Sequence, residues 1–182
     1  MDLNLTPVLP QSDGKVDFDM LDCSISGPEV TIIEDYELQT QPNSSASPVV
    51  ELIGKDSKIT FYTDCARPLL VLYVKNIQRF FKIALVCEDD TGKETKFVFS
   101  NNTSFVAVDK LGVCNIPMEV DIGWQYICID LEDTLANACG STFAICKEVT
   151  IHGSCRLHKI YFSSQRYADC ELPPYLRLVN SE

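Results

Sequence analysis

The sequence from Asp121 to Leu131 is Asp-Ile-Gly-Trp-Gln-Tyr-Ile-Cys-Ile-Asp-Leu, and it contains the single tryptophan of the chain. A turn leads into an alternating pattern in which Ile127, Ile129 and Leu131 share one parity. Because successive side chains of a β-strand point to opposite faces, the pattern predicts a strand with its apolar face in the core. Trp124 opens this strand, where its ring would cover the end of a core while the indole N–H binds a partner. The predicted structural core therefore consists of Trp124, Ile127, Ile129 and Leu131.

Short apolar segments, each bounded by turn residues, recur on both sides of this strand. Those before it are 30–33, 49–53, 58–62, 69–74, 80–87, 95–99, 105–108 and 114–118. After it come a helical segment at 132–139, stopped by Gly140, and a hairpin formed by 144–152 and 156–162. Many short strands with one short helix predict an all-β fold, an antiparallel β-sandwich of jelly-roll-like kind.

The two ends of the chain have a different character from this repeating pattern. Residues 1–23 are polar and acidic, and Pro7 and Pro10 interrupt them, so we expect an extended acidic tail without a regular element. The sandwich domain is then expected to span residues 24–179, with a flexible loop at 39–48. Prolines exclude the segment 172–178 from a central strand, and we expect it to lie along a sheet edge.

Charge and composition exclude several classes of function. The net charge is −11 and no dense cluster of Lys and Arg occurs, which argues against partners such as nucleic acid or an anionic membrane surface. The first residues lack the basic and apolar regions of a signal peptide, and no apolar run approaches the ~20 residues of a membrane span. We therefore expect a cytosolic chain. Its nine cysteines are an odd number and include no Cys-x-x-Cys pair, which predicts reduced thiols.

The sequence offers little that points to catalysis. It has no nucleophile elbow, no phosphate-binding glycine loop and no His-Glu-x-x-His motif, so we predict no enzyme and no catalytic residues. The spacing of His152, Cys155 and His158 could bring zinc ligands together across a hairpin, but a buried thiol between polar histidines explains it as well. Two acidic clusters lack the ligand spacing of a calcium loop. We therefore predict no metal site and no cofactor. Aromatic residues in the last third leave a carbohydrate-binding-module-like sandwich as the alternative function.

A further signal comes from motifs that follow one another in a specific order. They are Ile25–Pro28, Val74–Asn76, Ile116–Met118, Asp121–Trp124, Gly140, Ile151–Arg156, Ile160–Ser163 and Glu171–Pro173. In order and spacing they resemble the cilia- and flagella-associated protein 20 family. The resemblance extends from about Ile25 to Leu178 and so covers most of the chain.

The resemblance implies a structural, non-enzymatic protein of the ciliary or flagellar axoneme, with the basal body or centriole as further locations. The resemblance also implies a position at the inner junction of doublet microtubules, where members of the family help to join the A- and B-tubules. The implied partners are α/β-tubulin, an inner-junction protein like the parkin co-regulated gene product, and other axonemal proteins.

The sequence also departs from the family pattern, which indicates a divergent member or a paralogue. The chain is acidic where the family is basic, and Ala136 and Asn137 stand where the family helix carries paired arginines. Because tubulin surfaces are acidic, lost cations weaken simple electrostatic docking. The remaining candidates for tubulin contacts are Arg156, Lys159, Arg166 and Asn137.

Overall fold

The structure is a computed structural model, which describes residues 4–10, 14–38 and 47–178. Its first sheet, sheet A, contains β1 (Leu5–Leu9), β3 (Val30–Asp35), β4 (Ser47–Leu52), β6 (Leu69–Asn76), β11 (Gly123–Asp130) and β13 (Cys155–Ser163). Sheet B contains β2 (Cys23–Ser26), β5 (Lys58–Cys65), β7 (Lys82–Asp89), β8 (Glu94–Ser100), β9 (Ala107–Val108), β10 (Cys114–Pro117) and β12 (Phe143–His152). The helices are α1 (Leu131–Cys139) and the 3₁₀ turns η1 (Tyr36–Leu38), η2 (Asp169–Glu171) and η3 (Pro174–Leu176).

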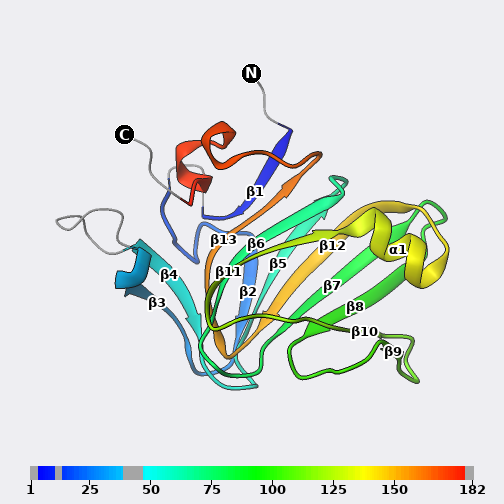
Figure 1. The fold of residues 1–182 in the computed structure, drawn as a ribbon, viewed down its shortest axis with the longest axis horizontal. Coiled ribbons are helices and arrows are strands. Elements are labelled where there is room, and N and C mark those ends of the chain that lie inside the picture. Colours follow the sequence, from blue (N-terminus) through cyan, green and yellow to red (C-terminus); the bar gives the residue numbers. More distant parts are fainter. Residues whose placement is uncertain (1–3, 11–13, 39–46, 179–182) are drawn as a thin grey trace.

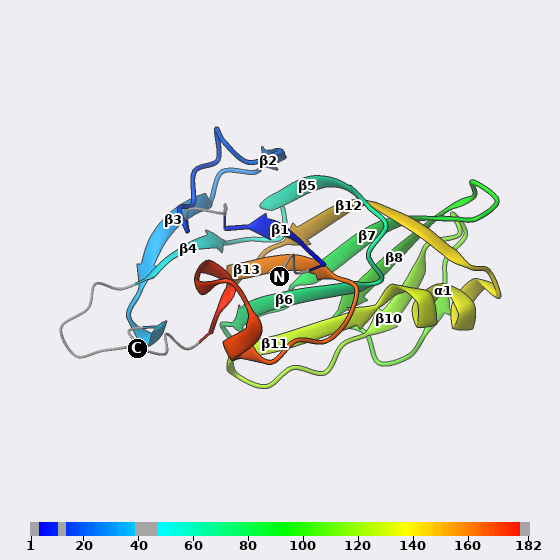
Figure 2. The same cartoon turned by 90° about the horizontal axis from the view of Figure 1, so that it is seen from above.

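The two sheets form a β-sandwich, which confirms the predicted fold class (Figures 1 and 2). The order of sheet A is β11-β6-β13-β4-β3, with β1 also paired to β13, and that of sheet B is β2-β5-β12-β7-β8-β10-β9. Neighbouring strands are antiparallel except for β8 and β10, which run parallel. Among the described residues, no helix is long and apolar enough to cross a membrane.

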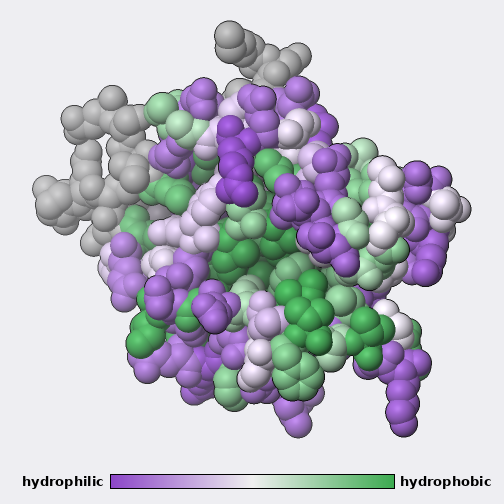
Figure 3. Space-filling model, turned by 45° about the vertical axis from the view of Figure 1, so that its right-hand side comes forward, coloured by the Kyte–Doolittle hydropathy of each residue, from purple (hydrophilic) through white to green (hydrophobic). Residues whose placement is uncertain are grey.

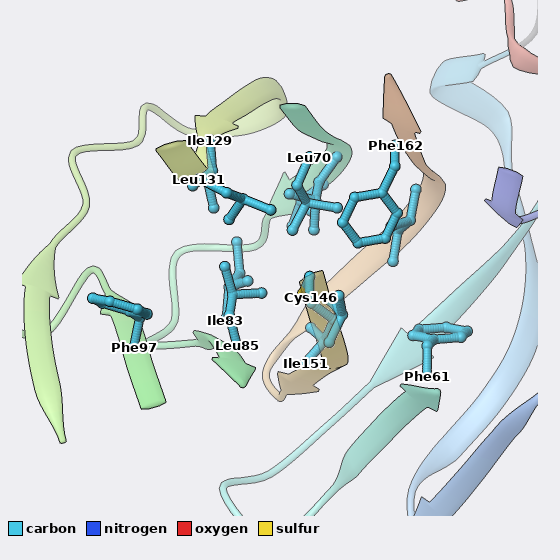
Figure 4. Close-up of a cluster of buried hydrophobic side chains, with 14 of the residues drawn as sticks. Phe61, Leu70, Ile83, Leu85, Phe97, Ile129, Leu131, Cys146, Ile151 and Phe162 are labelled. Carbon is cyan, nitrogen blue, oxygen red and sulfur yellow. The ribbon is translucent and has the colours of Figure 1, made fainter. Parts of the chain in front are cut away.

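The core fills the space between the sheets with alternate side chains from both (Figure 4). Phe61 and Phe97 come from sheet B, and Phe162 comes from sheet A; all three are buried. The structure places Ile129 and Leu131 in the same core, as the alternation of the tryptophan strand predicts. Ile127 is only half-buried, because β11 is the outermost strand of sheet A and this part of the core is open on one side.

Helix α1 ends where the sequence indicates but begins one residue earlier, at Leu131, which was predicted to belong to the tryptophan strand. The Asp130 carboxylate accepts a hydrogen bond from the Asp133 backbone N–H, which satisfies one free donor of the first turn. Gly140 adopts a left-handed conformation with φ of 64°, a backbone geometry that glycine takes at little cost. Between these caps the helix buries Leu131 and Leu135 against the open end of the sandwich.

The N-terminal segment corrects the prediction of a tail without a regular element. Residues 5–9 form β1, which pairs antiparallel with the second half of β13, while β4 pairs with its first half. Pro7 is tolerated because the strand lies at an edge, where a missing N–H costs little. Leu9 is fully buried, and Phe18 and Leu21 pack against the core. The segment thus completes sheet A.

The C-terminal segment corrects a second expectation. Instead of lying along a sheet edge, it crosses the outer face of sheet A as η2 and η3 (Figure 1). Leu172 and Leu176 pack there on Val71 and Tyr161 and form a second, smaller apolar cluster. Sheet A is therefore covered on both faces over part of its area. Of the loop predicted at 39–48, residues 39–46 lie outside the described residues, and the last two begin β4.

Candidate functional site

Arg156, a predicted partner contact, is held within the protein. Its Nε donates to Glu51 over 2.6 Å and its Nη1 donates to Asp35 over 2.9 Å. Lys75 donates to the same Asp35 oxygen and also pairs with Glu37. Burial opposes ionisation of Asp35, but the hydrogen bonds from Arg156 and Lys75 outweigh it and hold its pKa below the usual value. Arg156 therefore joins three strands of sheet A, and its charge is balanced internally.

Lys159 is the second predicted contact that the structure places inside. Only 6% of the residue is exposed, and its ammonium donates to the backbone carbonyl of Tyr175 in the C-terminal segment. Burial lowers its pKa to about 8, partly opposed by the charge of Asp169. A partner could not reach this ammonium without displacing the C-terminal segment, so the surface role expected from the sequence does not fit its position.

The other two predicted contacts lie on the surface. Arg166 is exposed in the connection between β13 and η2. Asn137 is exposed on α1, where it lines an apolar groove at the open end of the sandwich. The four candidates are thus not brought together: Arg156 and Lys159 are engaged by contacts within the protein, and the other two are exposed on separate elements.

Trp124 belongs to an aromatic cluster on the outer face of sheet A rather than to the end of the core. Its ring stacks on Tyr73 at 5.1 Å and meets His158 edge-on at 5.9 Å. The Lys75 ammonium lies 5.9 Å from the ring centre, within the range of a cation–π interaction. The indole N–H, expected to bind a partner, is buried and has none among the described residues. Because neighbours occupy both the ring face and its edge, this tryptophan has a packing role in sheet A.

A basic cluster that the sequence analysis missed occupies the outer face of sheet B. Lys58 on β5 and Lys82 on β7 both lie directly opposite His152 on β12, one on each side. Residues opposite each other in neighbouring strands have Cβ atoms about 5 Å apart, so these three side chains form a row. Lys96 projects from the same face on β8. We call Lys58, Lys82, Lys96 and His152 the lysine face.

The charges of the lysine face are available to a partner. Its three lysines are exposed, and none forms an ion pair within the described part of the chain. Burial lowers the pKa of His152, and the charges of Lys58, Lys82 and Lys96 lower it further. At neutral pH the imidazole is therefore neutral, and the lysines supply the positive charge. By contrast, Lys147 on the same sheet is engaged by Glu88 and Glu94.

The residues considered for a zinc site do not converge. His152 faces outward on sheet B, Cys155 is fully buried between the sheets, and His158 lies on the outer face of sheet A. Burial raises the pKa of the Cys155 thiol, which disfavours the thiolate that binds metal. Within the described ranges, no group of three or more metal-ligating side chains is assembled. All nine cysteines are free thiols.

Comparison with known sequences gives one family over nearly the whole chain. The family model for the CFA20 domain matches residues 19–180. Cilia- and flagella-associated protein 20 of Paramecium tetraurelia is 31% identical over 176 residues, which cover 92% of this chain and 88% of the relative. The protein of the same name from Chlamydomonas reinhardtii is 30% identical over the same length and the same shares of both chains.

Comparison with solved structures gives more distant similarities. A family 11 carbohydrate-binding module from Clostridium thermocellum matches with a TM-score of 0.39 and 8% identity, over 84% of this chain and 94% of that one. The catalytic domain of a GH87 α-1,3-glucanase matches with a TM-score of 0.42 and 11% identity, over 92% of this chain and 29% of that one. At these scores the similarities carry no inference about function.

Proposed function

The chain belongs to the CFA20 domain family as a divergent member, and we propose that it is a structural, non-enzymatic component of the ciliary or flagellar axoneme. The relatives are named as cilia- and flagella-associated proteins, which indicates the same association for this chain. The finer proposal is that it binds tubulin at the inner junction of doublet microtubules and helps to join the A- and B-tubules there.

The architecture suits a load-bearing role. A single core of side chains from both sheets fills the space between them. The C-terminal segment and the ion pairs around Asp35 brace the outer face of sheet A. A paired sheet resists bending, whereas loops and outer faces remain available for partners on several sides. A protein that holds two tubules at a fixed spacing needs both properties.

The lysine face is the observation that carries the tubulin-binding part of the proposal. Tubulin surfaces are acidic, and complementary charge favours docking of a basic patch even on a protein with a net charge of −11. The acidic remainder of the surface then restricts docking to one orientation, because like charges repel in the others. Docking of tubulin on the lysine face also leaves the other surfaces available for an inner-junction protein like the parkin co-regulated gene product.

Co-sedimentation of the purified chain with stabilised microtubules tests this proposal. The double variant Lys58→Glu/Lys82→Glu should lose most of its binding. The matched control is Lys93→Glu/Lys110→Glu, which changes the net charge equally at two exposed lysines outside the lysine face. We expect the control to bind within about twofold of the wild type, and wild-type binding to weaken as salt rises.

Two results would contradict the proposal. Equal losses in both double variants would show a response to net charge alone, and unchanged binding in both would remove the lysine face from the interaction. Fractionation of cilia gives a separate test of location: the chain should stay with the doublets through detergent extraction. Recovery in the membrane-plus-matrix fraction would contradict an axonemal role.

A further inference from the structure

A groove of about 610 Å³ lies at the open end of the sandwich, between β11 and α1 on one side and β8 and β10 on the other. Its base and walls are mainly apolar and include Ile116, Met118 and Ile127, all half-buried. Figure 3, which brings this side of the molecule forward, shows hydrophobic side chains gathered around a hollow. Val106, 63% exposed, lies at the rim.

The groove follows the free edge of β11. Ile127, Cys128 and Ile129 all line it, although consecutive residues of a strand point to opposite faces. A surface lined by both parities lies along the edge of a strand rather than over one of its faces. In the described part of sheet A, β11 pairs with β6 alone, so the backbone groups along its other edge have no strand partner.

The facing wall has a free edge as well. β10 pairs with β8 over all four of its residues, but β9 pairs only with Cys114 and Asn115. Within the described ranges, the outer edge of β10 therefore has no strand partner at Ile116 and Pro117. The core between the two sheets is therefore open at this end, where the free edge of β11 faces the free edge of β10. A strand added from a partner would fill such an opening.

The charges around the groove select one kind of occupant. Asp130 and Asp133 line its α1 end, and no Lys or Arg of the described part of the chain lines it. At its other end it continues through Pro117 and Met118 into a polar hollow lined by Glu119 and Asp121, again without a cation among the residues that the structure describes. An apolar groove with carboxylates at both ends complements a segment with apolar residues in its middle and basic residues at its flanks.

We propose that this groove binds an extended segment of a partner protein, which adds to the free edge of β11, inserts alternate apolar side chains, and carries Lys or Arg beside Asp133. An extended segment fits better than a helix because it pairs with the backbone groups of β11. This surface is separate from the lysine face, so the proposal does not depend on tubulin binding.

Selection from a display library of random peptides on the intact chain tests the proposal. Enriched peptides should show apolar residues at every second position and Lys or Arg at the ends. A synthetic copy of one such peptide then serves as the probe in fluorescence anisotropy. On its binding, hydrogen exchange of backbone amides in β11 should slow, because an added strand protects them.

Exposed residues give variants that leave the core intact. Val106→Glu places a charge at the rim and should weaken peptide binding about tenfold, which corresponds to ~1.4 kcal/mol. Its control is Val108→Glu, at a valine of similar exposure, 66%, that does not line the groove. Asp133→Lys should weaken binding similarly, whereas Glu132→Lys, on the same helix but outside the groove, should have little effect.

Each alternative occupant of the groove would give its own result, and each such result would contradict the proposal. Enriched peptides with apolar residues at helical spacing, or with acidic ends, would overturn the proposal. It would also fail if Val106→Glu and Val108→Glu weakened binding equally, or if no peptide were enriched. If the wild type formed dimers that Val106→Glu dissolved, the occupant would be a second copy of the chain, and the proposed partner segment would be wrong.

Discussion

The guanidinium of Arg156 donates from Nη1 to Oδ2 of Asp35 over 2.9 Å, although 121 positions separate the two residues in the sequence. The Asp35 side chain is 1% exposed and that of Arg156 is 27% exposed, so the carboxylate is enclosed while the cation reaches the surface. The pair joins β3, at one edge of sheet A, to β13 in its middle. Arg156 is thus a bracing residue of the sheet.

Replacement of Asp35 should destabilise the fold. Asp35→Asn removes the anion that Arg156 and Lys75 share, and we expect the free energy of unfolding to fall by about 2 kcal/mol in urea titrations. This is below the usual cost of breaking a buried pair because Glu51 and Glu37 continue to balance the cations. The control is Glu37→Gln, whose carboxylate is 65% exposed and should matter by less than ~0.5 kcal/mol. Similar effects of both variants would contradict a bracing role for Asp35.

The lowered pKa of Lys159 predicts that the free energy of unfolding increases with pH in the alkaline range. Its pKa in the fold is about 8, below the usual 10.5, so the unfolded chain binds more protons between these values. The contribution of this residue to the free energy of unfolding therefore rises with pH across that window. Lys159→Met, which removes the buried charge, should be about 1 kcal/mol more stable than the wild type at pH 7. The advantage should shrink by pH 10. A variant of unchanged stability at both pH values would contradict this account.

The lowered pKa of His158 predicts the same direction of pH dependence in the acid range. Burial, with a smaller contribution from the charge of Lys159, lowers its pKa to about 3. Below pH 6.5 the unfolded chain binds a proton that the folded imidazole rejects, so the free energy of unfolding falls as the pH drops toward 3. NMR titration of the two histidines should show His158 neutral at pH 5 and His152 gaining its proton at a higher pH than His158. Protonation of His158 near pH 6 would show that the aromatic cluster is open to water.

A single methyl group added at Gly27 should destabilise the fold strongly. Its φ is +96°, and an added Cβ would lie 2.6 Å from the Cα of Ser57 and even closer to the Asp56 carbonyl oxygen. Gly92, with φ of +85°, has nothing within 4 Å of such a Cβ. Gly92→Ala should therefore cost only the left-handed conformation, about 1 kcal/mol, and Gly27→Ala should cost clearly more. Thermal unfolding of the two variants, recorded side by side, would contradict this if their melting temperatures fell equally.

Local patterns in the sequence were enough to predict most of the strands and the helix, although not β1 and β2. The alternation at Ile127 and Ile129 predicts the core face of β11, and the acidic start and Gly140 predict the limits of α1. These features depend on neighbours within a few residues, and the structure retains them because local preference and tertiary packing agree. The cilia- and flagella-associated family was also identified from the order of short motifs.

Features that depend on strand register could not be predicted. Lys58, Lys82 and Lys96 lie on three strands, and only the pairing around His152 gathers them on one face. The register shift of β13 between Leu157 and Lys159 turns Lys159 to the outer face of sheet A, where the C-terminal segment covers it, and no local pattern indicates either feature. The prolines near the N-terminus predicted an irregular tail, but the free half of the β13 edge accepts a strand regardless of them.

The position of β13 also affects how the protein is made. This strand pairs with β6, β4 and β1, yet it is the last strand among the described residues. While a ribosome synthesises the chain, β1, β4 and β6 emerge first and have no central neighbour until residues 155–163 have left the exit tunnel. Sheet A therefore cannot assemble around its central strand before these residues emerge, and until then the nascent chain exposes apolar strand edges of the kind that chaperones shield.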